Sequence, residues 1–218
     1  MKNSHSSTFY PLSSILMPHL KRDFFAQPTL TVAKELLGQV LVREVNGQRL
    51  GGIIVETEAY IGPDDSASHA SKGRTPRAAV MFGSPGFIYV YFVYGMYHML
   101  NFITEQEGFP AAVLIRAVEP VEGVGVMQIN RQRPNAPLPK VINLTNGPGK
   151  LCQAFGIDSN LNKWDATKGQ NLWIESRNAA SNFEVAAGPR VGIDFATSKD
   201  RDAAWRFWLK GNQFVSKG

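Results

Sequence analysis

The sequence FIYVYFVYGMYHMLNFIT, residues 87–104, decides the fold. Two runs of aromatic and β-branched residues, 87–94 and 97–104, flank the short connection Gly95-Met96. Such residues favour β-strands, and a tight connection that contains glycine favours an antiparallel pairing of the strands on either side. We therefore predict a β-hairpin whose tip projects from the protein.

Further strands are predicted on both sides of this hairpin. Residues 39–44 and 50–60 flank the turn signal Asn46-Gly47, which is typical of a second hairpin. The other strand-like runs cover residues 111–118, 171–175, 189–194 and 205–210.

Helices are predicted between these strands, so the elements are mixed. Such a mixture favours an α+β fold, here a single domain with a curved, mostly antiparallel sheet, surrounding helices and the protruding β-hairpin. Capping and proline signals place the helices at residues 30–37, with Thr31 as N-cap and Gly38 as the end, at 120–130, opened by Pro120, and at 148–156.

The composition is that of a soluble globular protein. The chain has 218 residues, of which 44% are hydrophobic and 19% are charged, enough for one domain with a substantial core. We assign residues 21–218 to this domain and residues 1–20 to a flexible lead-in without the apolar segment of a signal peptide. No apolar run is long enough for a transmembrane helix. Cys152 is the single cysteine, which excludes intrachain disulfides and a thiolate metal cage.

The charge of the chain favours a polyanionic partner. Lysine and arginine exceed aspartate and glutamate by 23 to 18, and the pI is about 9.4. The short lead-in and the lack of a nuclear-targeting run indicate a bacterial cytoplasmic protein.

Two glutamates stand out in the strand of residues 50–60. Because side chains alternate along a strand, Glu56, Glu58 and Tyr60 share one face. One interpretation is a solvent-facing edge with ordinary surface carboxylates. The other is catalysis, since the strand leads directly into the long Gly/Pro/Ser-rich loop 62–86, and loops at strand ends often carry chemistry.

The tyrosines of the hairpin divide into two kinds. Tyr89 and Tyr97 are predicted to be core or cross-strand residues. Tyr91 is placed to meet the glutamate face if the two strands are neighbours. Tyr94 lies at the hairpin tip, where a bulky aromatic projects outward and can act as a wedge between base pairs.

The loops supply a histidine and several cations. His69 in loop 62–86 is either a surface residue or part of a site. Lys72, Arg74 and Arg77 follow it and predict either a solvated basic loop or contacts with phosphate. Gly147-Pro148-Gly149-Lys150 is either a plain helix start or a phosphate-binding one. No metal-binding motif is present, so we expect neither a metal nor another cofactor.

Several of these motifs together resemble the alkyladenine (3-methyladenine) DNA glycosylase family. The similarity extends from about Phe24 to Ser216. It rests on the order and spacing of FFAQP (24–28), LGQVLVR (37–43), VETEAY (55–60), His69, YFVYGMY (91–97), LIRAVEP (114–120), GPGKLCQA (147–154) and RVG (190–192).

The resemblance implies a catalytic role for three positions. Glu58 matches the general base that activates water for attack on the anomeric carbon. Arg116 and the backbone carbonyl of Val191 match the groups that hold this water. Glu56 has no catalytic role in this scheme and is expected to be structural.

The resemblance also implies how damaged DNA is held. Tyr60, His69 and Tyr91 match the pocket that sandwiches a flipped base, and the His69 backbone amide reads the edge of that base. Asn101 matches the residue that crowds the 2-amino group of guanine. The intercalating wedge is Tyr94 with Met96 beside it, and the candidates for contacts with the DNA backbone are Lys72, Arg74, Arg77 and Lys150.

The predicted activity is therefore that of a monofunctional DNA glycosylase. The enzyme would flip alkylated or deaminated purines (3-methyladenine, hypoxanthine, ethenoadenine) from double-stranded DNA and leave an abasic site, since no lysine falls at the matched pocket positions. A monomer is the default. Two alternatives are a carbohydrate glycosidase that uses Glu56 and Glu58, and a non-catalytic damaged-DNA-binding protein.

Overall fold

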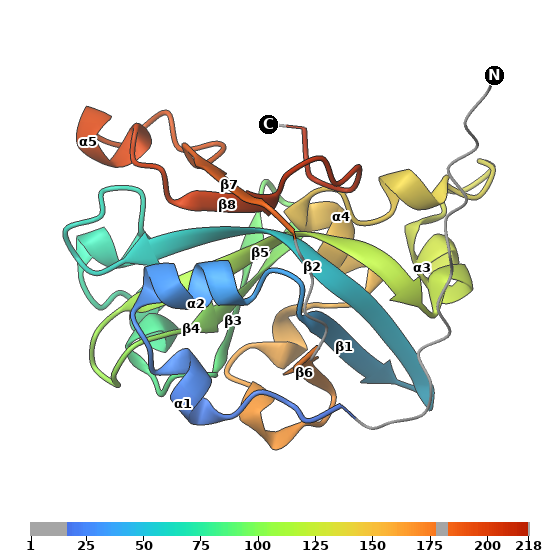
Figure 1. Ribbon diagram of the computed structural model, residues 1–218, viewed down its shortest axis with the longest axis horizontal. Coiled ribbons are helices and arrows are strands. Elements are labelled where there is room, and N and C mark those ends of the chain that lie inside the picture. Colours follow the sequence, from blue (N-terminus) through green and yellow to red (C-terminus); the bar gives the residue numbers. More distant parts are fainter. Residues whose placement is uncertain (1–16, 178–182, 218) are drawn as a thin grey trace.

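The computed structural model describes residues 17–177 and 183–217, and within these residues one sheet organises the molecule (Figure 1). Its central path runs β3-β4-β5-β2-β1-β6, β8 pairs with β2, β7 pairs with β8, and each of these pairings is antiparallel. The α+β class is confirmed. The strands are β1 (Val40–Val45), β2 (Gln48–Ile61), β3 (Ile88–Val93), β4 (Tyr97–Ile103), β5 (Ala111–Glu122), β6 (Leu172–Glu175), β7 (Val185–Gly188) and β8 (Arg206–Leu209).

Strand β2 is the axis of this sheet and changes its partner along its length. One edge pairs with β5 from Gly51 to Ile61, whereas the other pairs first with β1 and then, from Glu56 to Glu58, with β8. The register with β5 shifts near Gly51 and on both sides of Glu56. Such bulges bend and twist a strand, which accounts for the curvature that the sequence predicts.

The protruding hairpin of β3 and β4 is present, but its turn lies one residue earlier than predicted. The amide of Met96 donates to the carbonyl of Val93, so Tyr94 and Gly95 form the centre of the turn, with φ angles of 53° and 68°. Turns of this kind suit the twist of a hairpin because both central residues adopt positive φ. Tyr94 therefore accepts a conformation that tyrosine rarely adopts.

Helices pack against the sheet and enclose one main core. Phe25, Phe102 and Phe155 are among its largest fully buried side chains. In Figure 1, α2 lies on one side of β2, and β7 and β8 lie on the other side of β2. The helices are α1 (Arg22–Phe25), α2 (Thr29–Glu35), α3 (Val124–Arg131), α4 (Pro148–Ala154) and α5 (Ser198–Arg201).

The predicted start of the helix at residues 120–130 is wrong. Pro120 lies within β5, opposite Gly52, at a point where the register with β2 is irregular. A proline without an N–H is tolerated at such irregularities. Pairing with β2 therefore continues to Glu122, and α3 begins after Gly123, which has a φ of 70°.

Two further predictions are corrected. Thr31 is not an N-cap, because α2 begins at Thr29 directly after Pro28. Residues 189–194 form a loop and not a strand, while β7 covers Val185–Gly188. The polar groups of this loop are used elsewhere, since Val191 and Arg190 bond to groups on and after β2.

Residues 17–20 of the predicted lead-in are described, and two of them contact β6. His19 forms a β-bridge with Glu175, and Leu20 donates to the carbonyl of Ile174 in β6. The rest of the predicted lead-in, residues 1–16, lies outside the described residues. In the part of the chain that is described, no helix is long and apolar enough to cross a membrane.

Candidate active site

Glu58 lies in β2 and is fully buried, so the interpretation of a solvent-facing edge is wrong. Three groups donate to its carboxylate or pair with it. The Tyr60 hydroxyl is 2.9 Å from Oε2, the Val191 amide is 2.7 Å from Oε1, and Arg116 Nη1 is 3.2 Å from Oε1. A buried carboxylate needs such partners, and here they also fix its orientation.

Glu56 shares the predicted face with Glu58 but has different surroundings. Its Oε1 accepts from Arg116 Nε at 2.9 Å and from Arg206 Nε at 2.7 Å, and its side chain is fully buried. The two carboxylates are thus joined through one guanidinium, that of Arg116. With all of its partners supplied by the protein, Glu56 fits a structural role better than a catalytic one.

A cavity of about 280 Å³ brings the predicted pocket residues together, and Glu58 lies behind three of its lining residues, Tyr60, Arg116 and Val191. Tyr60, His69, Tyr91 and Asn101 all line it, together with Arg116 and Val191. The strands β2 and β3 are not neighbours, because β5 and β4 lie between them. Curvature of the sheet therefore brings Tyr91 to the same cavity as Tyr60.

The aromatic wall of this cavity is held by contacts behind it. The rings of His69 and Tyr91 meet edge to face, with centroids 4.6 Å apart, and His69 Nδ1 lies 2.9 Å from the Tyr89 hydroxyl. Asn101 donates to the carbonyl of Tyr89 at 3.1 Å. Burial raises the pKa of Tyr60 and of Tyr91 above the usual value, so both hydroxyls stay protonated. The pocket thus presents neutral rings.

His69 is also held neutral, which gives a testable pH dependence. Burial, followed by the positive charges of Arg77 and Lys72, lowers the pKa of His69 to about 4. Between that value and an unfolded pKa of about 6.5, the unfolded chain binds a proton that the folded chain does not. The free energy of unfolding therefore decreases as the pH falls through this window.

We expect the His69 ring signals in an NMR titration to stay constant from pH 8 to about pH 5.5. His69→Gln removes the titrating group, so its stability should decrease less than that of the wild type over the same range. A His69 that titrates near pH 6.5 would contradict the proposed surroundings.

Large apolar side chains surround the mouth of the cavity. Tyr94, at the hairpin tip, is 82% exposed and lines the cavity, and Met96 beside it is 58% exposed. Phe195 is 75% exposed and lines the same cavity from the loop that carries Val191. Phe195 was not among the predicted site residues, although its position three residues after the RVG motif was a usable signal.

The predicted basic residues lie outside the cavity lining. Lys72, Arg74 and Arg77 are exposed, and Arg77 is tied to the hairpin by a 2.7 Å hydrogen bond from Nη2 to the carbonyl of Phe92. Lys150 is partly buried and donates to Asn146 Oδ1 at 2.8 Å.

A helix start forms part of the cavity wall near Lys150. Pro148, the first residue of α4, lines the cavity. A side chain on Gly149 would lie 2.7 Å from the ring of Tyr97, so this glycine permits close packing of α4 on the hairpin.

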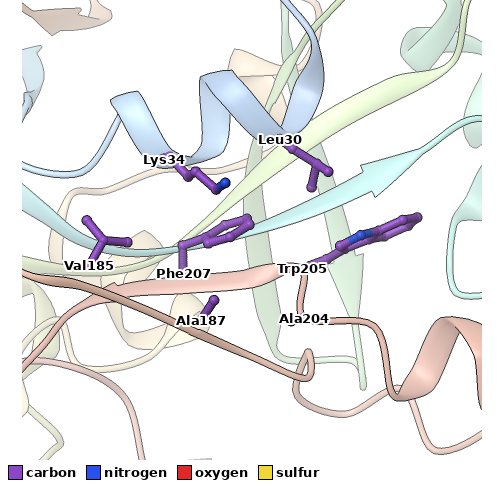
Figure 2. Close-up of a pocket in the computed structure, with 7 residues that line it drawn as sticks. All are labelled: Leu30, Lys34, Val185, Ala187, Ala204, Trp205 and Phe207. Atoms are coloured by element: carbon purple, nitrogen blue, oxygen red, sulfur yellow. The ribbon is translucent and has the colours of Figure 1, made fainter.

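A second, larger cavity of about 490 Å³ lies on the other face of β2 (Figure 2). Thr57 points to that face, since its hydroxyl donates to the carbonyl of Ala33 in α2, whereas Glu56 and Glu58 alternate to the opposite face. Lys34 and Leu30 reach from α2 toward Phe207 and Trp205. Among the residues that the structure describes, none that lines this cavity is a carboxylate or a histidine.

Comparison with known proteins agrees with the site geometry. A family model for methylpurine-DNA glycosylase (MPG) matches residues 23–213. This chain belongs to that family. A relative in Methanocella arvoryzae is 49% identical over 92% of this chain and 97% of its own length. Relatives in Clostridium perfringens (strain SM101) and Bacillus anthracis are each 47% identical, over 91% and 89% of this chain and 98% and 97% of their own lengths.

These relatives share one printed name, "Putative 3-methyladenine DNA glycosylase". Membership of the family makes this chain a DNA repair hydrolase that acts on N-glycosyl bonds, as the sequence predicts. The alternative of a carbohydrate glycosidase is thereby excluded.

Proposed function

We propose that this glycosylase flips damaged purines out of double-stranded DNA and hydrolyses the N-glycosidic bond with a water activated by Glu58. The observation that carries the proposal is the position of Glu58, a buried carboxylate bonded to three residues that line a cavity of neutral aromatic rings. A cavity of about 280 Å³ is near the lower end of the roughly 300–1,000 Å³ typical of ligand pockets, which suits one base.

The chemistry follows from the charge that develops during base release. As the bond from sugar to base breaks, the sugar becomes oxocarbenium-like, and a nearby carboxylate stabilises it while taking a proton from water. Tyr60, Val191 and Arg116 hold Glu58 in one orientation for this step. Arg116 and the carbonyl of Val191 are the proposed groups that hold the attacking water; the amide of Val191 is already used by Glu58.

Selection of damaged bases is proposed to rest on stacking. Alkylated purines such as 3-methyladenine are cationic and electron-poor, and aromatic faces attract such rings. Tyr60, His69 and Tyr91 supply these faces, and a neutral His69 adds no repulsion toward a cation. Asn101, fixed by the Tyr89 carbonyl, would crowd the 2-amino group of guanine. Neutral lesions such as hypoxanthine and ethenoadenine would depend on contacts with the His69 backbone amide.

The test is excision from duplex oligonucleotides that contain hypoxanthine or ethenoadenine, together with release of 3-methyladenine from alkylated DNA. Base release that produces strand breaks only after alkali or heat supports a monofunctional enzyme that leaves an abasic site. Breaks without such treatment would contradict it. Tight lesion binding without any release would favour the alternative, a non-catalytic damaged-DNA-binding protein.

The hairpin tip gives a prediction for base flipping. We expect Tyr94→Ala to weaken binding of lesion DNA by about tenfold, because base–aromatic stacking contributes roughly 1–3 kcal/mol. Since Tyr94 is 82% exposed, the melting temperature should not fall. Fluorescence anisotropy with labelled duplexes measures the effect, and Tyr94→Phe is the matched control because it keeps the ring. Equal affinities of Tyr94→Ala and the wild type would contradict the wedge.

We propose that four cations outside the cavity lining bind the DNA backbone, three of them exposed and the fourth, Lys150, partly buried. Lys72, Arg74 and Arg77 lie between His69 and the hairpin in sequence, and Lys150 lies beyond the start of α4. The chain carries a formal net charge of +5, which favours a polyanion. We propose that a monomer binds the duplex with this surface.

A further inference from the structure

The C-terminal tail enters the buried charge network behind Glu58. Phe214 is buried in the main core, and Asn212 Nδ2 donates to Glu119 Oε2 at 2.9 Å, so the tail is anchored before it reaches Ser216. The tail follows β8, the strand that pairs with β2 from Glu56 to Glu58. The tail therefore ends next to the catalytic strand.

Ser216 bonds both to Glu56 and to Arg116, the residue that joins Glu56 to Glu58. Its amide donates to Glu56 Oε2 at 2.7 Å, and its hydroxyl donates to Glu56 Oε1 at 2.9 Å. The same hydroxyl accepts from Arg116 Nη2 at 3.2 Å. Ser216 itself is 6% exposed, so water does not readily replace these contacts.

The guanidinium of Arg116 transmits this arrangement to Glu58. A guanidinium is planar and rigid, so fixing two of its nitrogens fixes the third. Nε is held by Glu56 at 2.9 Å and Nη2 by the Ser216 hydroxyl at 3.2 Å, which leaves Nη1 aimed at Glu58 Oε1 at 3.2 Å. A second guanidinium also pairs with Glu56, since Arg206 Nε lies 2.7 Å from Glu56 Oε1.

We propose that Ser216 and Glu56 are positioning residues for catalysis, which orient Arg116 and, through it, the general base Glu58. This inference rests on the proposed function of Glu58. It assigns the C-terminal tail to the active site, although the tail lies outside the cavity in which the base is held.

The experiment compares Ser216→Ala with Ser216→Thr. The alanine variant removes only the hydroxyl and keeps the amide bond to Glu56, whereas threonine keeps both. We expect Ser216→Ala to lower the single-turnover excision rate about tenfold, a change of about 1.4 kcal/mol, with affinity for lesion DNA within about twofold of the wild type. Ser216→Thr should restore most of the rate. The matched control is Gln213→Ala, an exposed residue of the same tail.

A merely structural role would give different results. Ser216→Ala would then lower the melting temperature and DNA affinity together, and its excision rate at low temperature would equal that of the wild type. Either that outcome or an unchanged rate at all temperatures overturns the proposal.

An NMR measurement separates this proposal from the proposed function. The Nε–H signal of Arg116 reports the buried ion pair whether or not any base is released. We expect this signal to shift and exchange faster with water in Ser216→Ala but not in Gln213→Ala. If the wild type releases no base from any substrate, the proposed function fails, while an unchanged Arg116 signal in Ser216→Ala would overturn the positioning role by itself.

Discussion

Glu58→Gln is expected to lower the single-turnover excision rate by about 10³-fold while lesion DNA still binds, because a general base typically contributes about 10²–10⁴-fold. Glutamine has nearly the same shape: its carbonyl oxygen can still accept from Val191, and its amide NH2 group can donate to the Tyr60 hydroxyl, but it takes no proton from water. The folded structure should survive, since the fully buried side chain is replaced by one of equal size.

The matched control is Glu44→Gln, an exposed glutamate near the end of β1. This variant makes the same chemical change away from the cavity and should excise at the wild-type rate. Gel-based excision assays with enzyme in excess measure the rate, and anisotropy measures the binding. If Glu58→Gln excised as fast as the wild type, the proposed base would be wrong, and Glu56 would be the remaining buried carboxylate beside Arg116.

Local sequence patterns predicted features that depend on residues close together in the chain, such as hairpin turns and the face of a strand to which a side chain points. The turn signal Asn46-Gly47 lies at a hairpin because few residue pairs accept positive φ at both positions. The turn predicted at Gly95-Met96 lies one residue earlier, at Tyr94-Gly95. Alternation along β2 correctly placed Glu56, Glu58 and Tyr60 on one face.

The predictions that failed concern segments whose structure depends on residues far away in the chain. Pro120 looked like the start of a helix, yet β2 extends far enough to pair with it. Residues 189–194 looked like a strand, yet their backbone and side chains bond to Glu58 and Asp65 instead. Tyr60 on β2 and Tyr91 on β3 line the same cavity although two strands, β4 and β5, lie between theirs in the sheet.

Sequence patterns also did not predict the contacts that hold the catalytic groups in place. Ser216 is 160 residues away from Glu56, and Arg190 is 125 residues away from Asp65. No periodicity connects positions so distant in the chain. The residues facing the base could thus be named from motifs, whereas those that hold the catalytic groups required the structure.

Asp65→Asn is expected to destabilise the fold by about 3–5 kcal/mol, the typical cost of leaving one partner of a buried ion pair without the other. Arg190 and Asp65 form a double hydrogen bond, with Nη1 to Oδ2 at 2.6 Å and Nη2 to Oδ1 at 2.8 Å, and both side chains are inaccessible to solvent. For a protein of this size the melting temperature should fall by roughly 6–20 °C, as measured by calorimetry.

The same pair fixes the loop that supports Glu58, so stability and catalysis should respond together. Arg190 also donates to the carbonyl of Ala59 and lies 4.7 Å from the centre of the Tyr60 ring, while Val191, the next residue, donates to Glu58. Loosening Arg190 should therefore lower the excision rate even at temperatures where Asp65→Asn is folded.

A control and a second variant separate charge from packing. Glu184→Gln breaks the pair of Glu184 with Lys210, whose side chains are 70% and 61% exposed, and should leave the melting temperature unchanged because exposed pairs contribute little. Adding Arg190→Met to Asp65→Asn removes the unpaired charge and should recover part of the lost stability, since an uncompensated buried charge costs more than an absent pair. If Asp65→Asn had the same melting temperature as the wild type, the pair of Asp65 and Arg190 would not be the anchor of this loop.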